Sequence, residues 1–541
     1  MKILYNIIIL VAFSLGMGAC DLADNIDDIK PQNQQNKDNV MSDSASAEAL
    51  LRNVYQQWRA GNMKDVRNHL FLSSGALVAP ITSYFMSGTS FQSNNVPYDD
   101  GVIVGVYTSL YKVVNMANVV NELLEEGNAP DLSEKRTEEM IAECRFHRAM
   151  AHFYLLRYFG QFYDMTSSYG VVVREESYPD HQVATARSSV ADVYTSIFKD
   201  LDYAIEKAPE YVSSDKHYYI SRLVAKALKA KVLLNQGDYS MAETVAGDIL
   251  RDAGRYGYSL ENRYDDVFVN SYNSKEVFFA LYAYGFEESF SAGDIVSNTT
   301  FGSYTEKIAR LEGWPEEWGF DIETGYGYDE RFGYVYRAEG PNMVGGSGEE
   351  EPSPWPEPEP EPEPEPLPDV YALTDDEMLP DGEGTMEPDG EGAPGWITPG
   401  VVKRNHKYPY RDMLDGEKGN TYFYLRLAEI YYIHAEAAAR NNHFDPARNS
   451  LKEVLNFERA YVYPQEIEEV PDNEMLEYIR KNKWLELFAE NNEEWFDMIR
   501  YHKAGDLNIT DVKSTITSDR QFIFPIPKSA LAGNNLLVQN P

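Results

Sequence analysis

The sequence predicts a mainly α-helical protein with a helical-repeat scaffold and a loop-rich lobe that contains a few short strands. Three observations support this fold class. A two-helix pattern occurs twice, amphipathic helices surround both copies, and a middle segment loses the helical period of apolar residues. The chain has 541 residues, more than one hydrophobic core usually supports, so we expect two lobes or a long solenoid.

The repeated pattern is a helix, a sharp turn and a second helix, with identical spacing over eight positions. Gly237 and Asn442 stand where the first helix must end, and both residue types tolerate the left-handed conformation found there. Tyr239 and Phe444 follow the turn and are expected to lie between the two helices. The pattern is that of a tetratricopeptide-type unit, and the alternative is two unrelated amphipathic helix pairs. The matched positions are Ala230, Leu234, Gly237, Tyr239, Ala242, Ala246, Ile249 and Leu250 in one copy, and Ala435, Ala439, Asn442, Phe444, Ala447, Leu451, Val454 and Leu455 in the other.

Residues 1–19 have the pattern of a lipoprotein signal peptide, and Cys20 is the predicted site of lipid attachment. The apolar run ends near Leu15 and is shorter than the ~20 residues that cross a bilayer. Small residues before Cys20 resemble the lipobox of bacterial lipoproteins, although Met17 stands where leucine is usual. The alternative is an ordinary secretory peptide with an incidental cysteine. Residues 20–46 are polar and are predicted to form a flexible tether that follows the acylated cysteine.

Two helical regions are predicted, an N-terminal one at residues 47–285 and a C-terminal one at residues 401–541. His147 and His152 are five residues apart on one of the expected helices, so they share no face and make a poor metal pair. The elements expected in the two regions are strong helices at 107–126 and 134–159, short strands and turns at 256–285, and a long last helix at 473–501.

Residues 286–400 are predicted to be the loop-rich lobe, with a low-complexity Glu-Pro insertion at 345–400. Alternating Glu and Pro favour an extended rod that packs no core, so we expect a solvated spacer. Positions 341–400 carry 17 acidic residues and no basic one. The acidic side chains offer at most a weak structural calcium site, because they lack the ligand spacing of an EF-hand loop, and no other cofactor or metal is expected. The acidic residues considered for calcium are Asp381, Glu383, Asp389 and Glu391.

The net charge of −39 argues against nucleic acid and against an anionic membrane surface as partners, because both require a positive footprint. The sequence carries no HExxH, GxSxG, phosphate-binding loop or metal-spaced Cys/His cluster. Acidic residues are so numerous that a pair of carboxylates suited to glycoside hydrolysis could be chosen at many places, so such a pair is no evidence for an enzyme. A repeat scaffold with aromatic loops fits a binding protein better than an enzyme, and no catalytic residue is predicted.

Aromatic and amide side chains in the predicted loops are the candidate ligand contacts, because loops on a rigid scaffold often carry binding residues. Aromatic rings stack on sugar rings, and amides bind hydroxyl groups. Trp314 and Trp318 are the first candidates, with packing inside the lobe as the alternative. Trp484 and Trp495 have helical spacing and are predicted to be core residues. The candidate ligand contacts are Trp314, Trp318, Tyr326, Tyr328, Tyr84, Asn94, Asn95 and Tyr98.

Several motifs, taken in their order along the chain, resemble the SusD/RagB family of outer-membrane lipoproteins. The closing run from Phe524 to Pro541 is similar to the family's C-terminus, and Asp329-Glu330-Arg331 is similar to its central Asp-x-Arg. Glu493-Glu494 departs from the resemblance, since the family more often has a basic residue before the tryptophan, which puts one local salt bridge in doubt. The other similar motifs are Arg148-Ala149 with Tyr154–Gly160, Val193-Tyr194 with Asp200–Ala204, Arg426–Glu429, Ala435–Ala437 and Trp495–Arg500.

The resemblance implies a mostly helical fold in which tetratricopeptide-like helix pairs cradle a loop-rich lobe. It also implies a lipid-anchored protein at the surface of the outer membrane. Such a protein captures a nutrient, usually an oligosaccharide and in some relatives a peptide, and closes over a SusC-like TonB-dependent transporter. Two other functions stay open: a surface glycan hydrolase, and a protein-binding adaptor, because tetratricopeptide grooves hold peptide tails.

Overall fold

The computed structural model divides the chain into two compact units, Met1–Arg337 with Lys403–Pro541, and Ala338–Val402. The described part of the chain is mostly helical with a few short strands, so the predicted fold class is confirmed. The residues that the structure describes are 40–58, 89–178, 184–210, 219–280, 331, 337–339, 402–404, 421–460, 462–487 and 490–541.

The N-terminal helices of the larger unit begin at capping residues that the sequence supplies. In each case a side-chain oxygen accepts a hydrogen bond from a backbone N–H of the first turn, which stabilises the helix start. The helices and their caps are α3 (Ser44–Gln57, Asp43), α6 (Gly101–Glu125, Asp100), α7 (Glu134–Phe159, Ser133), α8 (Val190–Lys207, Ser189), α9 (Arg222–Gln236, Ser221) and α10 (Tyr239–Asp252, Asp238).

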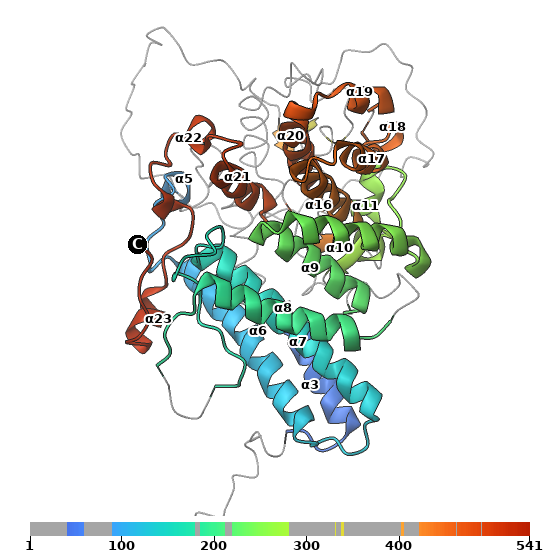
Figure 1. Cartoon of the computed structure of the whole chain (residues 1–541). Helices are drawn as coiled ribbons and strands as arrows, with labels where there is room; N and C mark the ends of the chain where they lie inside the picture. Colours follow the sequence, from blue (N-terminus) through green and yellow to red (C-terminus); the bar gives the residue numbers. More distant parts are fainter. Residues whose placement is uncertain are drawn as a thin grey trace, which may run out of the picture. The chain divides into compact units, whose positions relative to one another are not determined.

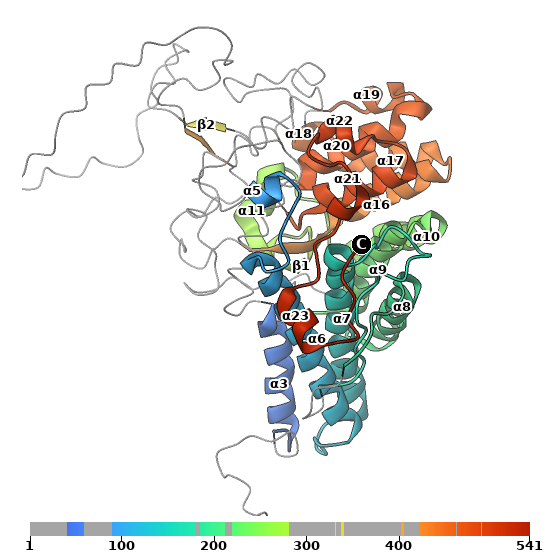
Figure 2. The ribbon, with the colours of Figure 1, turned by 90° about the vertical axis from the view of Figure 1, so that its left-hand side faces the viewer.

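Helices α3, α6, α7 and α8 lie side by side, and α8 packs against α9, where the repeat begins (Figure 1 and Figure 2). Helix α6 is the one helix in the described residues that is long and apolar enough to cross a membrane. Half of the most apolar stretch of α6 is buried inside the fold, and the helix packs against α3 and α7. Helix α6 is therefore a core helix of this fold.

The two copies of the repeat stack directly on each other, although they lie far apart in the sequence. Helix α10 packs against α16, so the green pair and the orange pair are neighbours in Figure 1. Gly237 and Asn442 have φ angles of 90° and 62°, so the predicted left-handed turn residues are confirmed. Tyr239 and Phe444 are only half-buried, and Tyr239 lies under the guanidinium group of Arg440 from the other copy, 4.9 Å away. The second copy consists of α16 (Leu427–Arg440) and α17 (Phe444–Val454).

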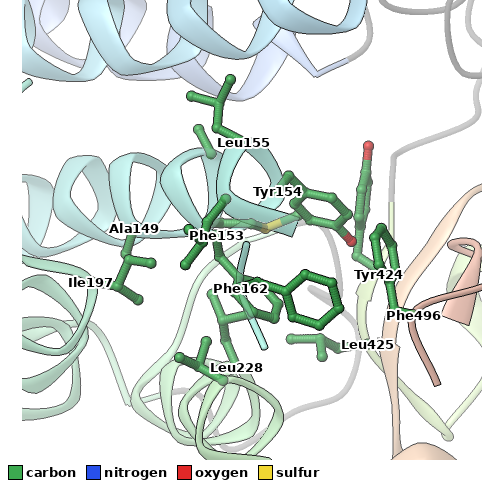
Figure 3. Close-up of a cluster of buried hydrophobic side chains, with 14 of the residues drawn as sticks. Ala149, Phe153, Tyr154, Leu155, Phe162, Ile197, Leu228, Tyr424, Leu425 and Phe496 are labelled. Carbon is green, nitrogen blue, oxygen red and sulfur yellow. The ribbon is translucent and has the colours of Figure 1, made fainter. Parts of the chain in front are cut away.

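The main hydrophobic core joins α7, α8 and α9 to the C-terminal elements. Figure 3 shows Phe153 of α7 on the side of that helix that faces Leu228 of α9, while Leu155 lies on its opposite side. Leu425 and Phe496 belong to the C-terminal half and lie in the same cluster. Because these residues are distant in sequence, the core makes the two predicted helical regions one packed body. Trp484 and Trp495 are buried in this core, as predicted from their helical spacing, and so is Trp58.

The prediction of a single long helix over residues 473–501 is wrong. The structure has two helices there, α20 (Met475–Leu487) and α21 (Glu493–Ala504). Asn491 and Asn492 both have positive φ, 54° and 59°, and two successive left-handed residues cannot continue a right-handed helix. Their side chains compensate, since Asn491 Nδ2 donates to the Tyr424 carbonyl at 2.9 Å and Asn492 Nδ2 donates to the Tyr158 hydroxyl at 2.7 Å.

The short strands predicted over residues 256–285 are partly wrong. Tyr264–Asn270 forms helix α11, because its buried side chains recur at helical spacing. Val277–Ala280 is strand β1, and it pairs antiparallel with β4 (Phe423–Arg426). A second two-stranded sheet pairs β2 (Arg337–Glu339) with β3 (Val402–Arg404).

The remaining elements are short and lie mostly in the C-terminal region. They are α5 (Thr89–Gln92), α18 (Phe457–Ala460), α19 (Pro464–Glu469), α22 (Ile509–Val512), α23 (Lys528–Gly533), and the 3₁₀ turns Ala253–Tyr256, Ser271–Asn273, Asp472–Glu474 and Asp519–Gln521.

Candidate functional site

Three of the predicted ligand contacts lie in described residues, and all three belong to the turn between α5 and α6. They are Asn94, Asn95 and Tyr98. The other candidates, together with the predicted lipid site and calcium ligands, lie outside the described residues: Tyr84, Trp314, Trp318, Tyr326, Tyr328, Cys20, Asp381, Glu383, Asp389 and Glu391.

Asn94 holds the turn in place. Its side chain is 4% exposed, and its φ of 53° is one that asparagine adopts more readily than most residues. The backbone N–H of Asn94 donates to the Phe91 carbonyl at 3.1 Å, and its Oδ1 accepts from the Thr515 hydroxyl at 2.7 Å. These contacts fasten the turn to the C-terminal segment, so the structure gives Asn94 a supporting position, and its direct contact with a ligand stays a prediction.

Asn95 and Tyr98 of the same turn are exposed to solvent. The Tyr98 side chain is 41% exposed, and its carbonyl accepts from the Lys528 backbone N–H at 2.8 Å. The Lys528 ammonium lies 5.7 Å from the centre of the Tyr98 ring. Ser93 and Asp99 of the same turn are exposed too, so the turn and Lys528 together expose an aromatic ring, an amide, a hydroxyl, a carboxylate and an ammonium. Such a set binds polyhydroxy compounds by ring stacking and hydrogen bonds. We call Ser93, Asn95, Tyr98, Asp99 and Lys528 the turn surface.

The closing segment of the chain, residues 513–541, packs against this turn and is hydrogen-bonded to it. Gln521 Nε2 donates to the Ser93 carbonyl at 3.3 Å, and the rings of Phe91 and Phe524 meet edge to face with centroids 5.8 Å apart. Asn540 Nδ2 donates to the carbonyls of Phe524 and Phe159, at 2.6 Å and 3.2 Å. The motif that ends the chain therefore ties the turn surface to the end of α7, a role that sequence reasoning did not assign to it.

Arg331 lies in a buried site lined by α16 and α20. Its side chain is fully buried, and it donates to the Tyr432 hydroxyl at 3.1 Å and to Asn482 Oδ1 at 2.8 Å. It also lies 3.5 Å from a carboxylate oxygen of Glu486. The motif Asp329-Glu330-Arg331 does not by itself predict that its arginine is buried, because no local pattern encodes the contacts with Tyr432 and Asn482.

Glu486 belongs to a buried cluster of charges next to the start of β1 and the end of β4. Arg426 Nη1 lies 2.7 Å and Arg459 Nη2 lies 2.9 Å from Glu486 Oε1. Both arginines also pair with Glu276, at 2.6 Å and 2.9 Å. Burial alone would raise the pKa of Glu486, but the guanidinium groups outweigh it and lower that pKa to about 2. Glu486 is thus ionised and paired with arginines, which suits a structural cluster rather than general acid–base chemistry.

Glu493 forms a second buried set of ion pairs at the start of α21. Its Oε1 lies 2.9 Å from Arg157 Nη1 and 2.7 Å from Lys231 Nζ, and Lys231 also contacts Glu429 at 2.8 Å. Burial raises the pKa of Glu493, but Arg157 and Lys231 together lower it to about 2. At the position where the sequence departs from the resembled pattern, the acidic residue therefore has two cationic partners of its own.

Two histidines and the cysteine in the middle of α7 are packed inside the fold. Burial lowers the pKa of both His147 and His152 to about 3, so both rings are neutral. The indole N–H of Trp58 donates to His147 Nδ1 at 3.0 Å. Cys144 is buried, and burial raises the pKa of its thiol, which keeps it unreactive. Within the described ranges, no group of three or more His, Cys, Asp or Glu side chains is placed to hold a metal ion.

The stacked helix pairs belong to a class of helical folds with solved members. The fold matches a SusD superfamily protein from Bacteroides thetaiotaomicron with a TM-score of 0.64 at 20% identity, covering 92% of this chain and 99% of that one. It also matches a laminarin-binding SusD-like protein with a TM-score of 0.58 at 19% identity, with the same coverage of 92% and 99%.

Sequence comparison gives the family. Residues 27–234 match the SusD-like family described as "Starch-binding associating with outer membrane", and residues 371–541 match the SusD family. The chain belongs to the SusD/RagB family.

Two relatives show how far the sequence similarity extends. A SusD-like protein of Bacteroides ovatus is 28% identical over 218 residues, which is 38% of this chain and 37% of that protein. SusD-like protein P2 of Formosa agariphila is 22% identical over 565 aligned positions, covering 99% of both chains. The similarity to the second relative therefore runs across the whole chain, including the segment between the two family matches.

Proposed function

We propose that this protein is a lipid-anchored protein of the outer-membrane surface that binds an oligosaccharide and delivers it to a SusC-like TonB-dependent transporter. The observation that carries the proposal is the membership of the SusD/RagB family at both ends of the chain. A family description that names starch binding and the outer membrane, and a laminarin-binding protein of the same fold, support a carbohydrate as the ligand.

The protein binds its ligand without converting it. Its exposed turn surface carries an aromatic ring and hydrogen-bonding groups on a rigid support, as a binding site requires. The buried carboxylates described above are held by arginine and lysine, and the pKa values of Glu486 and Glu493 lie far below those that a general acid needs at neutral pH. The energy for import comes from the transporter.

Affinity purification from native outer membranes tests the delivery step. A C-terminally tagged full chain is expected to co-purify with a large TonB-dependent barrel protein, while a Cys20→Ala variant is expected to lose both its membrane anchor and most of that partner. Recovery of hydrolysed glycan from the purified complex would favour the hydrolase instead. Saturable binding of peptides with no binding of glycans would leave the transport role but change the ligand.

A further inference from the structure

Two aromatic side chains outside the turn surface lie against each other at the surface of the larger unit. Phe457 is 45% exposed and Tyr463 is 54% exposed, and their ring centroids are 4.8 Å apart with a tilt of 33°. Most large apolar side chains of the described residues are buried, so an exposed pair in contact is unusual here. We call Phe457 and Tyr463 the aromatic pair.

Both members of the aromatic pair lie next to residues with specific contacts to the fold. Phe457 begins α18, and two residues later Arg459 is fully buried, with its guanidinium 2.9 Å from both Glu276 and Glu486. Tyr463 precedes α19, where its backbone N–H donates to Glu466 Oε1 at 2.8 Å and proline opens the helix. Rings on a fixed backbone lose little conformational entropy on binding, which is the condition for an effective stacking surface.

The charges near the aromatic pair are mainly negative. Glu458 and Glu466 are exposed beside the two rings in sequence. The nearby cations are already engaged, since Lys452 pairs with Glu468 and Arg448 pairs with Asp472. An anionic ligand would be repelled here. A neutral polyhydroxy ligand fits, because its C–H faces stack on rings and its hydroxyl groups donate to carboxylates.

We propose that Phe457 and Tyr463 form a second contact surface for the same neutral polysaccharide that the protein captures. The proposal rests on the proposed function and extends it to polymeric ligands. Helix α18 carries Phe457, and helix α5 directly precedes the turn surface. Figure 1 shows these two helices on opposite sides of the larger unit. A long polymer engages two separate surfaces at once and gains affinity through effective concentration, whereas a short oligosaccharide engages only one.

Affinity electrophoresis of the full mature chain tests this surface. Gels contain laminarin, amylopectin or galactomannan, and a polymer that retards the wild type is then used with its own hexasaccharide in calorimetry. The double variant Phe457→Ala with Tyr463→Ala is expected to bind the polymer about tenfold more weakly or worse, with unchanged hexasaccharide affinity. The exchange variant Phe457→Tyr with Tyr463→Phe keeps both rings and is expected to bind as the wild type does.

Tyr178→Ala is the matched control, because Tyr178 is an exposed aromatic residue at 47% that belongs to neither surface. It is expected to leave polymer affinity unchanged, and all variants are expected to keep the thermal midpoint of the wild type. Equal polymer binding by the double variant and the wild type overturns the second surface and leaves the proposed function intact. If the wild type binds none of the three polymers, the second surface and the proposed carbohydrate ligand fail together.

Discussion

Glu493 shows at the residue scale how this fold uses buried charge. The carboxylate holds Arg157 of α7 and Lys231 of α9 to the start of α21, so three helices meet at one side chain. Sequence patterns identified the helices that carry these residues, but they did not reveal the pairing. The partners lie hundreds of residues apart, and charge spacing along one helix carries no information on contacts between helices.

Glu493→Gln is predicted to lower the free energy of unfolding by ~3–5 kcal/mol, because it leaves two buried cations with one fewer counter-charge. Urea unfolding at neutral pH measures this change. The control is Glu175→Gln, which breaks an ion pair whose Lys199 side chain is 58% exposed, and which is expected to cost ~0–1 kcal/mol. Similar costs for the two variants would contradict the structural role of Glu493.

The buried histidines predict a dependence of stability on pH. His147 and His152 have pKa values near 3 in the folded protein and 6.5 in the unfolded chain, so only the unfolded chain binds protons between these values. Stability is therefore predicted to fall as the pH drops from 6.5 toward 3. Glu143 acts in the opposite sense from pH 4.5 to about 7, because burial raises its pKa to about 7.

His147→Gln removes one of these proton sites, so the slope of unfolding free energy against pH should decrease by ~1.4 kcal/mol per pH unit between pH 5 and 6. Guanidinium unfolding at several pH values measures the slope. An unchanged slope would show that His147 is not a buried neutral group.

At the scale of elements, the eight matched positions predicted both helix pairs and both turn residues. They did not predict that the two pairs stack on each other, because stacking depends on contacts between α10 and α16 that no local pattern encodes. A Cβ atom on Gly247 of α10 would lie 3.3 Å from His434 of α16, which shows how closely the helices approach. The prediction of one long helix over residues 473–501 was wrong because a local pattern was present where the structure has a break. The apolar period continues past Asn491 and Asn492, and tertiary hydrogen bonds stabilise the break.

The repeat turn gives a prediction at this scale. Gly237→Ala is expected to destabilise the protein by ~1–2 kcal/mol, since a Cβ atom is strained at a φ of 90°. Asn442→Gly, at a φ of 62°, is expected to be neutral or slightly stabilising. The same Gly→Ala change at Gly254 is the control, because a Cβ atom there meets nothing within 4 Å. Thermal unfolding compares the three, and equal loss at Gly237 and Gly254 would refute the role of the turn.

At the scale of the whole molecule, the sequence predicted two helical regions on either side of a loop-rich lobe with an acidic insertion, and the chain divides into Met1–Arg337 with Lys403–Pro541, and Ala338–Val402. The candidate ligand site was less predictable. Composition pointed to the turn before α6, and the structure leaves Asn95 and Tyr98 exposed there but encloses Asn94. Exposure of single residues in a loop depends on the segment that covers it, here the closing residues 513–541, and loop composition does not encode that cover.

Deletion of residues 341–400, which removes 17 acidic residues, is predicted to leave the larger unit folded. The strands β2 and β3 flank the deletion and pair with each other, so a short Gly-Ser linker can close the gap. The thermal midpoint is expected to change by less than about 2 °C, the smallest shift that ~1 kcal/mol produces in a domain of moderate size. A large drop would show that the acidic segment contributes to the fold.

The central claim is that the protein binds a carbohydrate and releases it unchanged. Calorimetric titration of the mature chain with soluble neutral glycans, followed by chromatography of the recovered ligand, tests this claim most directly. We expect saturable binding of at least one glycan, with the ligand recovered at its original length. Shortened products, or binding of peptides and of no glycan, would contradict it.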